Sequence, residues 1–469
     1  MTQHTSFGGR LTILGFGSIG QGVLPLILRH IEMPRERVRI VGGDARGAAV
    51  AAEYGIAHTV QPVTRDNYRD VLAPMLGRGD FLLNLSVDVS SVALVQLCRE
   101  LGALYLDTCV EPWAGGYTDP SLPTPARTNY ALRESALALA RPGAGDPTAV
   151  MTHGANPGLV SHFVKQALLN LAADIGWETA VPATRDDWAS LAARLGVKVI
   201  HIAERDTQTA LIAKKPGEFV NTWSIDGFAG EGNQPAELGW GTHEKVLPPD
   251  GHHHAAGCGA AIWLDRRGAA TRVRSWTPGE GPFHGFLITH NESISIADYY
   301  TLREGGIVRY RPTVHYAYHP CDDAVLSLHE LAGKNWRMQA EQRLLMREIA
   351  SGVDELGVLL MGHARGAYWY GSRLSIEQAR RHAPHNNATS LQVAAAVLGG
   401  MVWAMENPSS GVVEADQLDH VRVLEIAGPY LGDMAGAYSP WTPLLDRGGL
   451  FADAVNTDCP WQFENFRVV

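Results

Sequence analysis

Six polar segments stand among apolar residues, where a buried polar group needs a partner. They combine carboxylates with asparagine, histidine and tryptophan side chains, and they are Asn84–Asp88, Asp107–Trp113, His153–Gly158, His201–Gln208, Asn221–Ser224 and Thr289–Ser293. Carboxylates and histidines are side chains that commonly exchange protons with a reacting group. These segments are therefore the first candidates for a functional site.

A glycine-rich turn follows the first apolar run of the chain. Gly15-Phe16-Gly17-Ser18-Ile19-Gly20 comes after the expected strand 11–14 and opens an expected helix over 21–30. In such a turn the first glycine permits a tight bend, the second lets the backbone approach a pyrophosphate, and the third lets the helix pack on the sheet. The pattern predicts a dinucleotide-binding turn that includes Ser18 and Ile19; a purely structural turn is the alternative.

The end of the second expected strand bears on which dinucleotide binds. An acidic residue there usually holds the adenosine ribose of NAD. The strand ends Val41-Gly42-Gly43-Asp44, so Asp44 is the candidate, although two glycines displace it. We expect NAD, and the strand end leaves NADP open.

The elements that must position these residues fall into two kinds. The first 150 residues alternate apolar runs with amphipathic stretches, which predicts a doubly wound parallel sheet with strands at 11–14, 38–41, 81–87, 103–106 and 149–152 and helices at 21–30 and 92–101. Ligands bind at the carboxyl ends of strands in such sheets. This adds further cofactor-binding candidates at the strand ends, namely Asn84, Ser86, Asp107, Thr108, Ala155 and Asn156.

Beyond a Pro- and Gly-rich break at 141–147 the pattern changes. Helices are expected at 159–173 and 391–406, and short strands at 197–202, 219–225, 271–276, 285–289 and 308–318. They predict a mixed α+β second domain with a mostly antiparallel sheet. We expect a Rossmann domain over 1–155, a substrate and dimerisation domain over 156–385, and a C-terminal helix and tail over 386–469 that returns to the first domain.

Composition limits the class of protein. The chain has 469 residues and a net charge of −10, which argues against a nucleic-acid partner and leaves room for acidic pockets that hold a cationic substrate. No apolar run approaches the roughly 20 residues that span a bilayer, and the start lacks a signal-peptide pattern. Five scattered cysteines without C-x-x-C spacing favour a reducing compartment. We expect a cytoplasmic protein without membrane contact and, since no cluster completes four ligands, without a metal.

The long motifs resemble those of a known family. Asp107–Trp113, Gly154–Gly158, His201–Gln208 and His290–Asp298 are similar to segments of the bacterial homospermidine synthases, within the saccharopine dehydrogenase-like superfamily. The resemblance runs from the glycine turn to Phe463 and departs at Gly42, where the ribose-binding acid is expected. It implies a homodimeric enzyme that keeps NAD bound and joins two putrescines, or spermidine and putrescine, into homospermidine. Ammonia leaves and the redox balance is neutral, because the hydride taken to form the first imine returns to the second.

The resemblance also implies roles for individual side chains. Carboxylates would hold and deprotonate the diamine, an asparagine would orient it, and a tryptophan would offer a cation–π face. Carried over to this sequence, the pocket consists of Glu111, Glu204, Glu231, Asn156, Trp223, His290 and Asp354, with Asp88 a weaker candidate.

Each of these residues also has a purely structural interpretation. The alternatives are a turn cap for Glu111, an ion pair with Arg205 or Arg272 for Glu204, a solvated loop for Glu231, a turn former for Asn156, a strand core for Trp223, a satisfied core histidine for His290 and a helix-surface acid for Asp354.

Two rival functions also remain. One is a saccharopine- or carboxyspermidine-type dehydrogenase with net hydride transfer, whose carboxylated substrate would favour arginines in the pocket. The other is a nucleotide-sensing regulator, which would not need buried carboxylates in the second domain.

Overall fold

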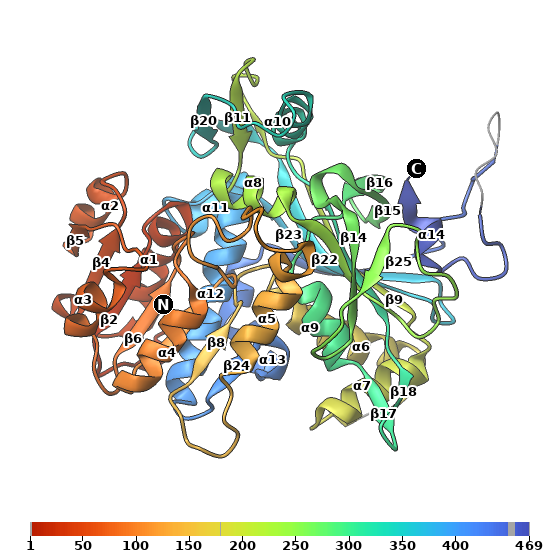
Figure 1. Ribbon diagram of the computed structural model, residues 1–469, viewed down its shortest axis with the longest axis horizontal. Coiled ribbons are helices and arrows are strands. Elements are labelled where there is room, and N and C mark those ends of the chain that lie inside the picture. Colours follow the sequence, from red (N-terminus) through yellow and green to blue (C-terminus); the bar gives the residue numbers. More distant parts are fainter. Residues whose placement is uncertain (1, 179, 449–454, 469) are drawn as a thin grey trace.

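One of the two large sheets is parallel. The structure is a computed structural model that describes residues 2–178, 180–448 and 455–468. Within those residues, seven strands follow the order β24-β8-β7-β6-β2-β4-β5 and every neighbouring pair is parallel. They are β2 (Leu11–Leu14), β4 (Val38–Gly42), β5 (Ala57–Val60), β6 (Phe81–Asn84), β7 (Leu104–Asp107), β8 (Ala149–Met151) and β24 (Val412–Glu414). This confirms the expected Rossmann-like sheet (Figure 1).

Helices cover both faces of this sheet because both faces of its strands are apolar. Ile13 and Leu83 point into the main hydrophobic core, which contains α1 and α12, whereas Leu14 and Leu82 point into a second core with α4. The helices are α1 (Ser18–His30), α2 (Ala48–Glu53), α3 (Tyr68–Leu72), α4 (Ser91–Leu101), α5 (Asn129–Leu137) and α12 (Ala388–Glu406). Among the described helices, α12 is the one long and apolar enough to cross a membrane, and 89% of its apolar window is buried in the protein.

The second large sheet is mixed and mostly antiparallel. Its main path is β13-β14-β12-β19-β9-β22-β23-β25, and β15, β16 and β26 join at the side. Only β19 and β9 pair in parallel among these described strands. The strands are β9 (Val199–Asp206), β12 (Pro235–Gly239), β13 (Gly251–His253), β14 (Ala261–Arg267), β15 (Arg272–Thr277), β16 (Gly281–Phe286), β19 (Thr313–His319), β22 (Val353–Met361), β23 (Ala367–Ser375), β25 (Asp433–Ser439) and β26 (Arg467–Val468).

The remaining helices and short strands lie outside the two large sheets. The helices are α6 (Leu159–Asp174), α7 (Arg185–Leu195), α8 (Ile225–Asn233), α9 (Asn291–Tyr299), α10 (Asp322–Gly333), α11 (Ile376–His382), α13 (His420–Ala427) and α14 (Phe463–Phe466). The short strand pairs are β1 (Thr5–Ser6) with β3 (Ile31–Glu32), β10 (Thr209–Ala210) with β21 (Ile349–Ser351), β11 (Glu218–Asn221) with β20 (Glu341–Leu344), and β17 (Leu302–Glu304) with β18 (Ile307–Tyr310).

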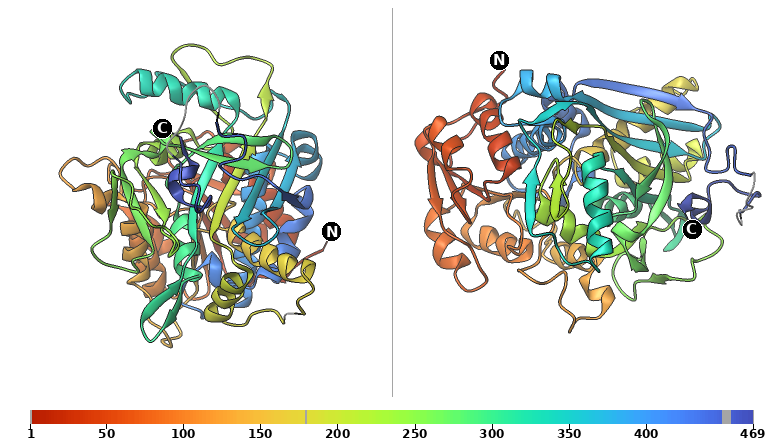
Figure 2. Two further views of the ribbon diagram at one scale, coloured as in Figure 1. Left: turned by 90° about the vertical axis from the view of Figure 1, so that its right-hand side faces the viewer. Right: turned by 90° about the horizontal axis from the view of Figure 1, so that it is seen from above.

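The C-terminal part of the chain crosses between the two sheets. Helix α12 packs against α1, and β24 pairs with β8 at the edge of the first sheet. The chain then goes back, since β25 pairs with β23 and β26 pairs with β15 in the second sheet. Seen from above, blue helices of this part lie between the red first sheet and the green and cyan strands of the second (Figure 2).

Several expected strands are wrong in their extent: the strand expected over 81–87 ends at Asn84, and the one expected over 285–289 is β16, which ends at Phe286. Two further differences have a local cause. The strand expected over 219–225 ends at Asn221, because the Ser224 side chain accepts a hydrogen bond from Gly227 N and caps α8. The strand expected over 308–318 is split into β18 and β19, because Pro312 between them has no backbone N–H to donate. Trp223 therefore lies in the turn before α8 and not on a strand.

Buried polar contacts around α5 fix the two sheets against each other. The Glu237 carboxylate, from β12, accepts hydrogen bonds from the backbone N–H groups of Asn129 at 2.7 Å and Tyr130 at 3.2 Å. The start of α5 is thus satisfied by an acid of the other sheet. One turn later Arg133 donates to Asp298 of α9 at 2.9 Å and to Glu414 of β24 at 2.6 Å. We call these two sets of contacts the α5 lock.

Candidate active site

The three glycines of the turn occupy different surroundings. Gly15 has φ +86°, and a Cβ there would lie 2.5 Å from the carbonyl carbon of Leu85, so the bend requires glycine. A Cβ at Gly20 would lie 2.9 Å from the Gly15 oxygen. Gly17 differs, because a Cβ there would meet no described atom within 4 Å. Gly17 is also the N-cap of α1 and provides no side-chain cap, so no side chain of Gly17 covers the helix start, and helix starts of this kind commonly bind phosphate groups.

Asp44 follows the end of β4 and is occupied by a neighbour. Its carboxylate pairs with Arg46 at 2.7 Å, and about half of its side chain is exposed. A side chain at Gly42 would meet Nε2 of His58 at 2.7 Å, which explains physically why the acid is displaced from the strand end. Binding of a ribose by Asp44 stays a prediction, and Arg46 would have to share the carboxylate.

Other cofactor candidates hold the strand ends in shape. The Asn84 side chain donates to the Tyr105 hydroxyl at 3.1 Å and accepts from Ser86 Oγ at 2.6 Å. The buried Asp107 carboxylate accepts from Thr152 N at 2.6 Å and from the Tyr105 hydroxyl at 2.8 Å. Burial raises the pKa of Asp107 to about 6. Thr108 and Ala155 flank the same loop ends, and direct contact of these residues with NAD stays a prediction.

Glu204 lies near the end of β9 and is buried. Its Oε2 accepts hydrogen bonds from Asn156 Nδ2 at 2.6 Å and from the Tyr316 hydroxyl. The alternative of an ion pair is wrong for Arg205, whose guanidinium instead lies 3.3 Å from Asp322. Burial raises the pKa of Glu204 to about 7, and the two hydrogen bonds oppose that rise. A carboxyl group with this pKa exchanges its proton easily near neutral pH.

Two further acids lie beside Glu204. Asp206 follows it on the same face of β9, and Asp354 is opposite Asp206 in the register of β22. Asp206 accepts from Thr222 Oγ1 at 2.9 Å, and Asp354 accepts from Thr389 Oγ1 at 2.5 Å. Burial raises the pKa of Asp206 to about 6; burial and then Glu204 raise that of Asp354 well above its usual range. The interpretation of Asp354 as a helix-surface acid is wrong, because the residue is buried in a strand.

His290 lies between two carboxylates. Its Nε2 is 3.0 Å from Glu231 Oε2, and its Nδ1 is 3.2 Å from Glu292 Oε1. Burial acts to lower the pKa of His290, but the two carboxylates outweigh it and raise the pKa well above its usual range. Glu231 lies within α8 and not in a loop, so the solvated-loop interpretation is wrong. The two carboxylates therefore favour the imidazolium form, in which each ring nitrogen can donate to one of them.

Glu111 comes from the loop after β7 and faces the same group of acids. Its Oε1 accepts from the Cys109 thiol at 3.0 Å, and its Oε2 accepts from Asp88 N at 3.4 Å. Burial raises the pKa of Glu111 to about 7, and Glu231 contributes a smaller rise. The Asp88 side chain itself is exposed.

Trp223 is half-buried at the start of α8. Its indole N–H donates to the Tyr318 hydroxyl at 3.0 Å, and its ring lies 5.3 Å from that of Phe228. Since Tyr318 is on β19 next to Glu204 on β9, the tryptophan is tied to the carboxylate cluster.

The structure brings all seven predicted pocket residues into one network between the two sheets. Glu111 and Asn156 come from loops of the first sheet, and the other five come from the second domain or its strands. Sequence reasoning missed several members, which are Asp206, Glu292, Tyr316, Tyr318 and Thr389. For two of them a signal was present, because Asp206 stands two positions from Glu204 and Glu292 stands two positions from His290. The network, acidic except for His290, suits a cationic ligand with amine ends.

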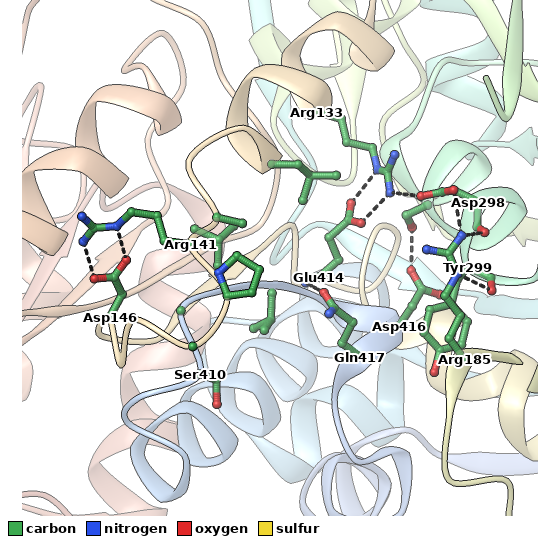
Figure 3. A pocket seen from close by; sticks show the side chains of 18 of the residues that line it. Arg133, Arg141, Asp146, Arg185, Asp298, Tyr299, Ser410, Glu414, Asp416 and Gln417 are labelled. Atoms are coloured by element: carbon green, nitrogen blue, oxygen red, sulfur yellow. Dashed lines mark hydrogen bonds and ion pairs between the residues drawn. The ribbon is translucent and has the colours of Figure 1, made fainter. Parts of the chain in front are cut away.

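A separate cavity of about 560 Å³ lies between α5, α9 and β24 (Figure 3). None of the seven pocket residues lines it. Its walls carry the Arg133 ion pairs of the α5 lock and the pair of Arg141 with Asp146. Among the described residues, no group of three or more His, Cys, Asp or Glu side chains could hold a metal ion.

Comparisons with known proteins place this geometry in a family. The saccharopine dehydrogenase NADP binding domain matches residues 11–150, and the saccharopine dehydrogenase C-terminal domain matches residues 154–438. A homospermidine synthase of Blastochloris viridis is 57% identical over 465 residues, which are 98% of this chain and 97% of the relative. The chain belongs to the homospermidine synthase family.

Further members agree with this placement. A homospermidine synthase of Mesorhizobium japonicum is 52% identical over 467 residues, covering 98% of this chain and 96% of the relative. A crystal structure of the homospermidine synthase of Legionella pneumophila in complex with NAD superposes with a TM-score of 0.93 at 50% identity, covering 99% of this chain and 98% of that one. The resemblance expected from the motifs is thus confirmed over nearly the whole chain.

Proposed function

We propose that this protein is an NAD-dependent homospermidine synthase that joins two putrescines, or spermidine and putrescine, with release of ammonia. The observation that carries the proposal is the buried network around Glu204 and His290, which is acidic and ends on the indole of Trp223. A diamine is a dication near neutral pH and needs carboxylates and an aromatic face to replace its water. Substrates of the rival dehydrogenases carry carboxylates, which this network would repel.

The glycine turn would hold the cofactor. The start of α1 at Gly17 would hold the pyrophosphate, and Thr108 and Ala155 at the loop ends would be among the residues that hold the rest of the cofactor. When bound, NAD would supply reversible hydride transfer, which makes the overall reaction redox-neutral.

The protein's own side chains accept and release the protons of the reaction and hold the diamine. Glu204 keeps both of its described hydrogen bonds on Oε2, so we assign to Oε1 the removal of a proton from the attacking amine. Its pKa of about 7 lets it take that proton and give it up again in each turnover. Asn156 fixes the carboxylate, and Trp223 faces an ammonium group of the diamine. Glu231 and Glu292 hold His290 as a cation that limits the negative charge of the pocket.

One incubation tests the proposal. The protein is mixed with NAD and putrescine, and the products are separated by mass. Homospermidine and ammonia should form in equal amounts. The near-ultraviolet absorbance of reduced nicotinamide should not rise, because no NADH accumulates. Stoichiometric NADH, or oxidation of added NADH with an oxo-acid, would instead identify the protein as a net dehydrogenase.

We also propose that the protein works as a homodimer in the cytoplasm. The dimer is proposed because the resemblance to the homospermidine synthases implies one. The cytoplasm is proposed because the scattered cysteines are all free in the described residues. Light scattering of the eluting protein should give twice the mass of 50.8 kDa.

A further inference from the structure

Two tyrosines of β19 lie behind the proposed amine site. Tyr316 and Tyr318 are two positions apart and therefore point to the same face of the strand. Both are buried, and their rings are stacked with centroids 5.0 Å apart and planes inclined by 7°. The pair thus forms one rigid unit on a central strand of the second sheet.

Tyr316 holds the proposed proton acceptor. Its hydroxyl donates to Glu204 Oε2, the same oxygen that accepts from Asn156. Its ring also lies 4.5 Å from the ring of His290. A donor on one carboxylate oxygen fixes the group and favours its ionised form.

Tyr318 holds the proposed cation-binding face. Its hydroxyl accepts the indole N–H of Trp223 at 3.0 Å, and its ring lies 5.7 Å from Phe228. Phe228 in turn lies 5.3 Å from the Trp223 ring. The indole is therefore fixed both at its nitrogen and along its side.

We infer that Tyr316 and Tyr318 are positioning residues of the amine site: Tyr316 holds the carboxylate of Glu204, Tyr318 holds the indole of Trp223, and their stacking fixes the proton acceptor relative to the cation-binding face. The inference rests on the proposed function. According to this inference, strand β19 sets the distance and orientation between the Glu204 carboxylate, which acts in the chemical step, and the Trp223 indole, which binds the substrate.

Single-atom variants separate the two roles. In Tyr316→Phe the ring and the stacking stay, but Glu204 loses a donor that favours its ionised form. The acidic limb of kcat should move up by about one pH unit, with KM for putrescine changed less than about twofold. In Tyr318→Phe the indole loses its acceptor, so KM should rise about three- to tenfold while the acidic limb stays in place.

Tyr310→Phe is the control, because its hydroxyl also donates a hydrogen bond, which is part-buried, to the Val197 carbonyl at 2.8 Å, away from the site. It should leave both the limb and KM unchanged. The inference is overturned if Tyr316→Phe leaves the limb in place, or if all three variants lose activity only in proportion to lost folded protein by circular dichroism. Absence of homospermidine with the unaltered chain would instead remove the proposed function.

Discussion

Glu204 is subject to two opposing influences. Burial favours its neutral form, and the donors Asn156 and Tyr316 favour its charged form. An acid poised in this way is suited to accept a proton in the transition state, whereas an acid that only anchors an ammonium acts equally in the ground state.

Glu204→Gln should therefore lower kcat roughly a hundredfold or more, with a smaller change in KM. Glutamine keeps the shape and can accept the two hydrogen bonds, but it cannot take the proton. Turnover and NAD affinity are measured together, and NAD should still bind. A near-normal kcat with only KM raised would reduce Glu204 to an electrostatic anchor.

The same variant has an effect on stability with a defined sign. The carboxyl titrates near 4.5 ordinarily and at about 7 in the folded protein, so between these values the folded state binds more protons than the unfolded state. Stability then falls as pH rises through this window, and the loss from this group is complete above it. At pH 8 the free energy of unfolding of Glu204→Gln, measured by urea titration, should exceed that of the unaltered protein by about 1–3 kcal/mol. At pH 4.5 the two proteins should differ little. Equal differences at both pH values would contradict the raised pKa.

Trp223 is predicted to act through its ring and not through the core. Trp223→Phe should keep more activity than Trp223→Ala, because phenylalanine retains a weaker π-face, and the alanine variant should lose about tenfold from a cation–π contribution of about 0.5–2 kcal/mol. Steady-state kinetics on folded protein provide the measurement. Equal losses in the two variants would indicate that Trp223 mainly packs against Phe228 and Tyr318.

At the residue scale, the motifs identified side chains better than their surroundings. Glu111, Glu204 and Trp223 could be named because the motifs around them resemble those of the homospermidine synthases, but the helix that carries Glu231 and the strand that carries Asp354 could not. Those positions depend on pairing between segments more than 100 residues apart along the chain, which local patterns do not report. The tyrosines of β19 were missed because alternating tyrosines in a strand are usually core.

At the scale of elements, the first sheet was largely predictable. Its inner strands are buried on both faces, so each appears in the sequence as a short apolar run, and β2 begins and ends where expected. The edge strand β5 is mostly exposed and gave no such run. In the second domain the apolar pattern separates strands from helices less clearly. The pattern over 219–225 predicts one strand, although β11 ends at Asn221 and the Ser224 cap starts α8.

The start of α1 gives the prediction that belongs to this scale. Gly17→Val should abolish NAD binding in calorimetry while the protein stays folded, because a Cβ at Gly17 fills open space and touches no described atom. Gly8→Val is the control, since a Cβ at that exposed glycine also meets no described atom within 4 Å. NAD affinity equal to that of the control would mean that the glycine turn is only structural.

At the scale of the whole molecule, the α5 lock makes the two sheets depend on each other. Arg133 is buried between Asp298 and Glu414, and removal of one partner from a buried ion pair leaves uncompensated charge.

Arg133→Met should lower the free energy of unfolding by about 3–5 kcal/mol and separate the urea transition of the two domains. Arg141→Met is the control on the same cavity, because 57% of the Arg141 side chain is exposed and an ion pair of an exposed arginine should contribute at most about 1 kcal/mol. Fluorescence and circular dichroism, followed together, check both. Similar small losses in the two variants would show that the lock does not couple the domains.

The place of β24 has a consequence for biosynthesis. A ribosome releases the chain from its N-terminus, so β8 emerges long before residues 412–414, which cover its free edge. Until then the nucleotide-binding half lacks both that edge strand and α12, the apolar helix that packs on α1. Its open edge and uncovered apolar face can be completed only when most of the polypeptide has been made. Cofactor capture is thus delayed until nearly the whole protein exists, and a fragment that stops at residue 155 should be unable to fold as an independent NAD-binding unit.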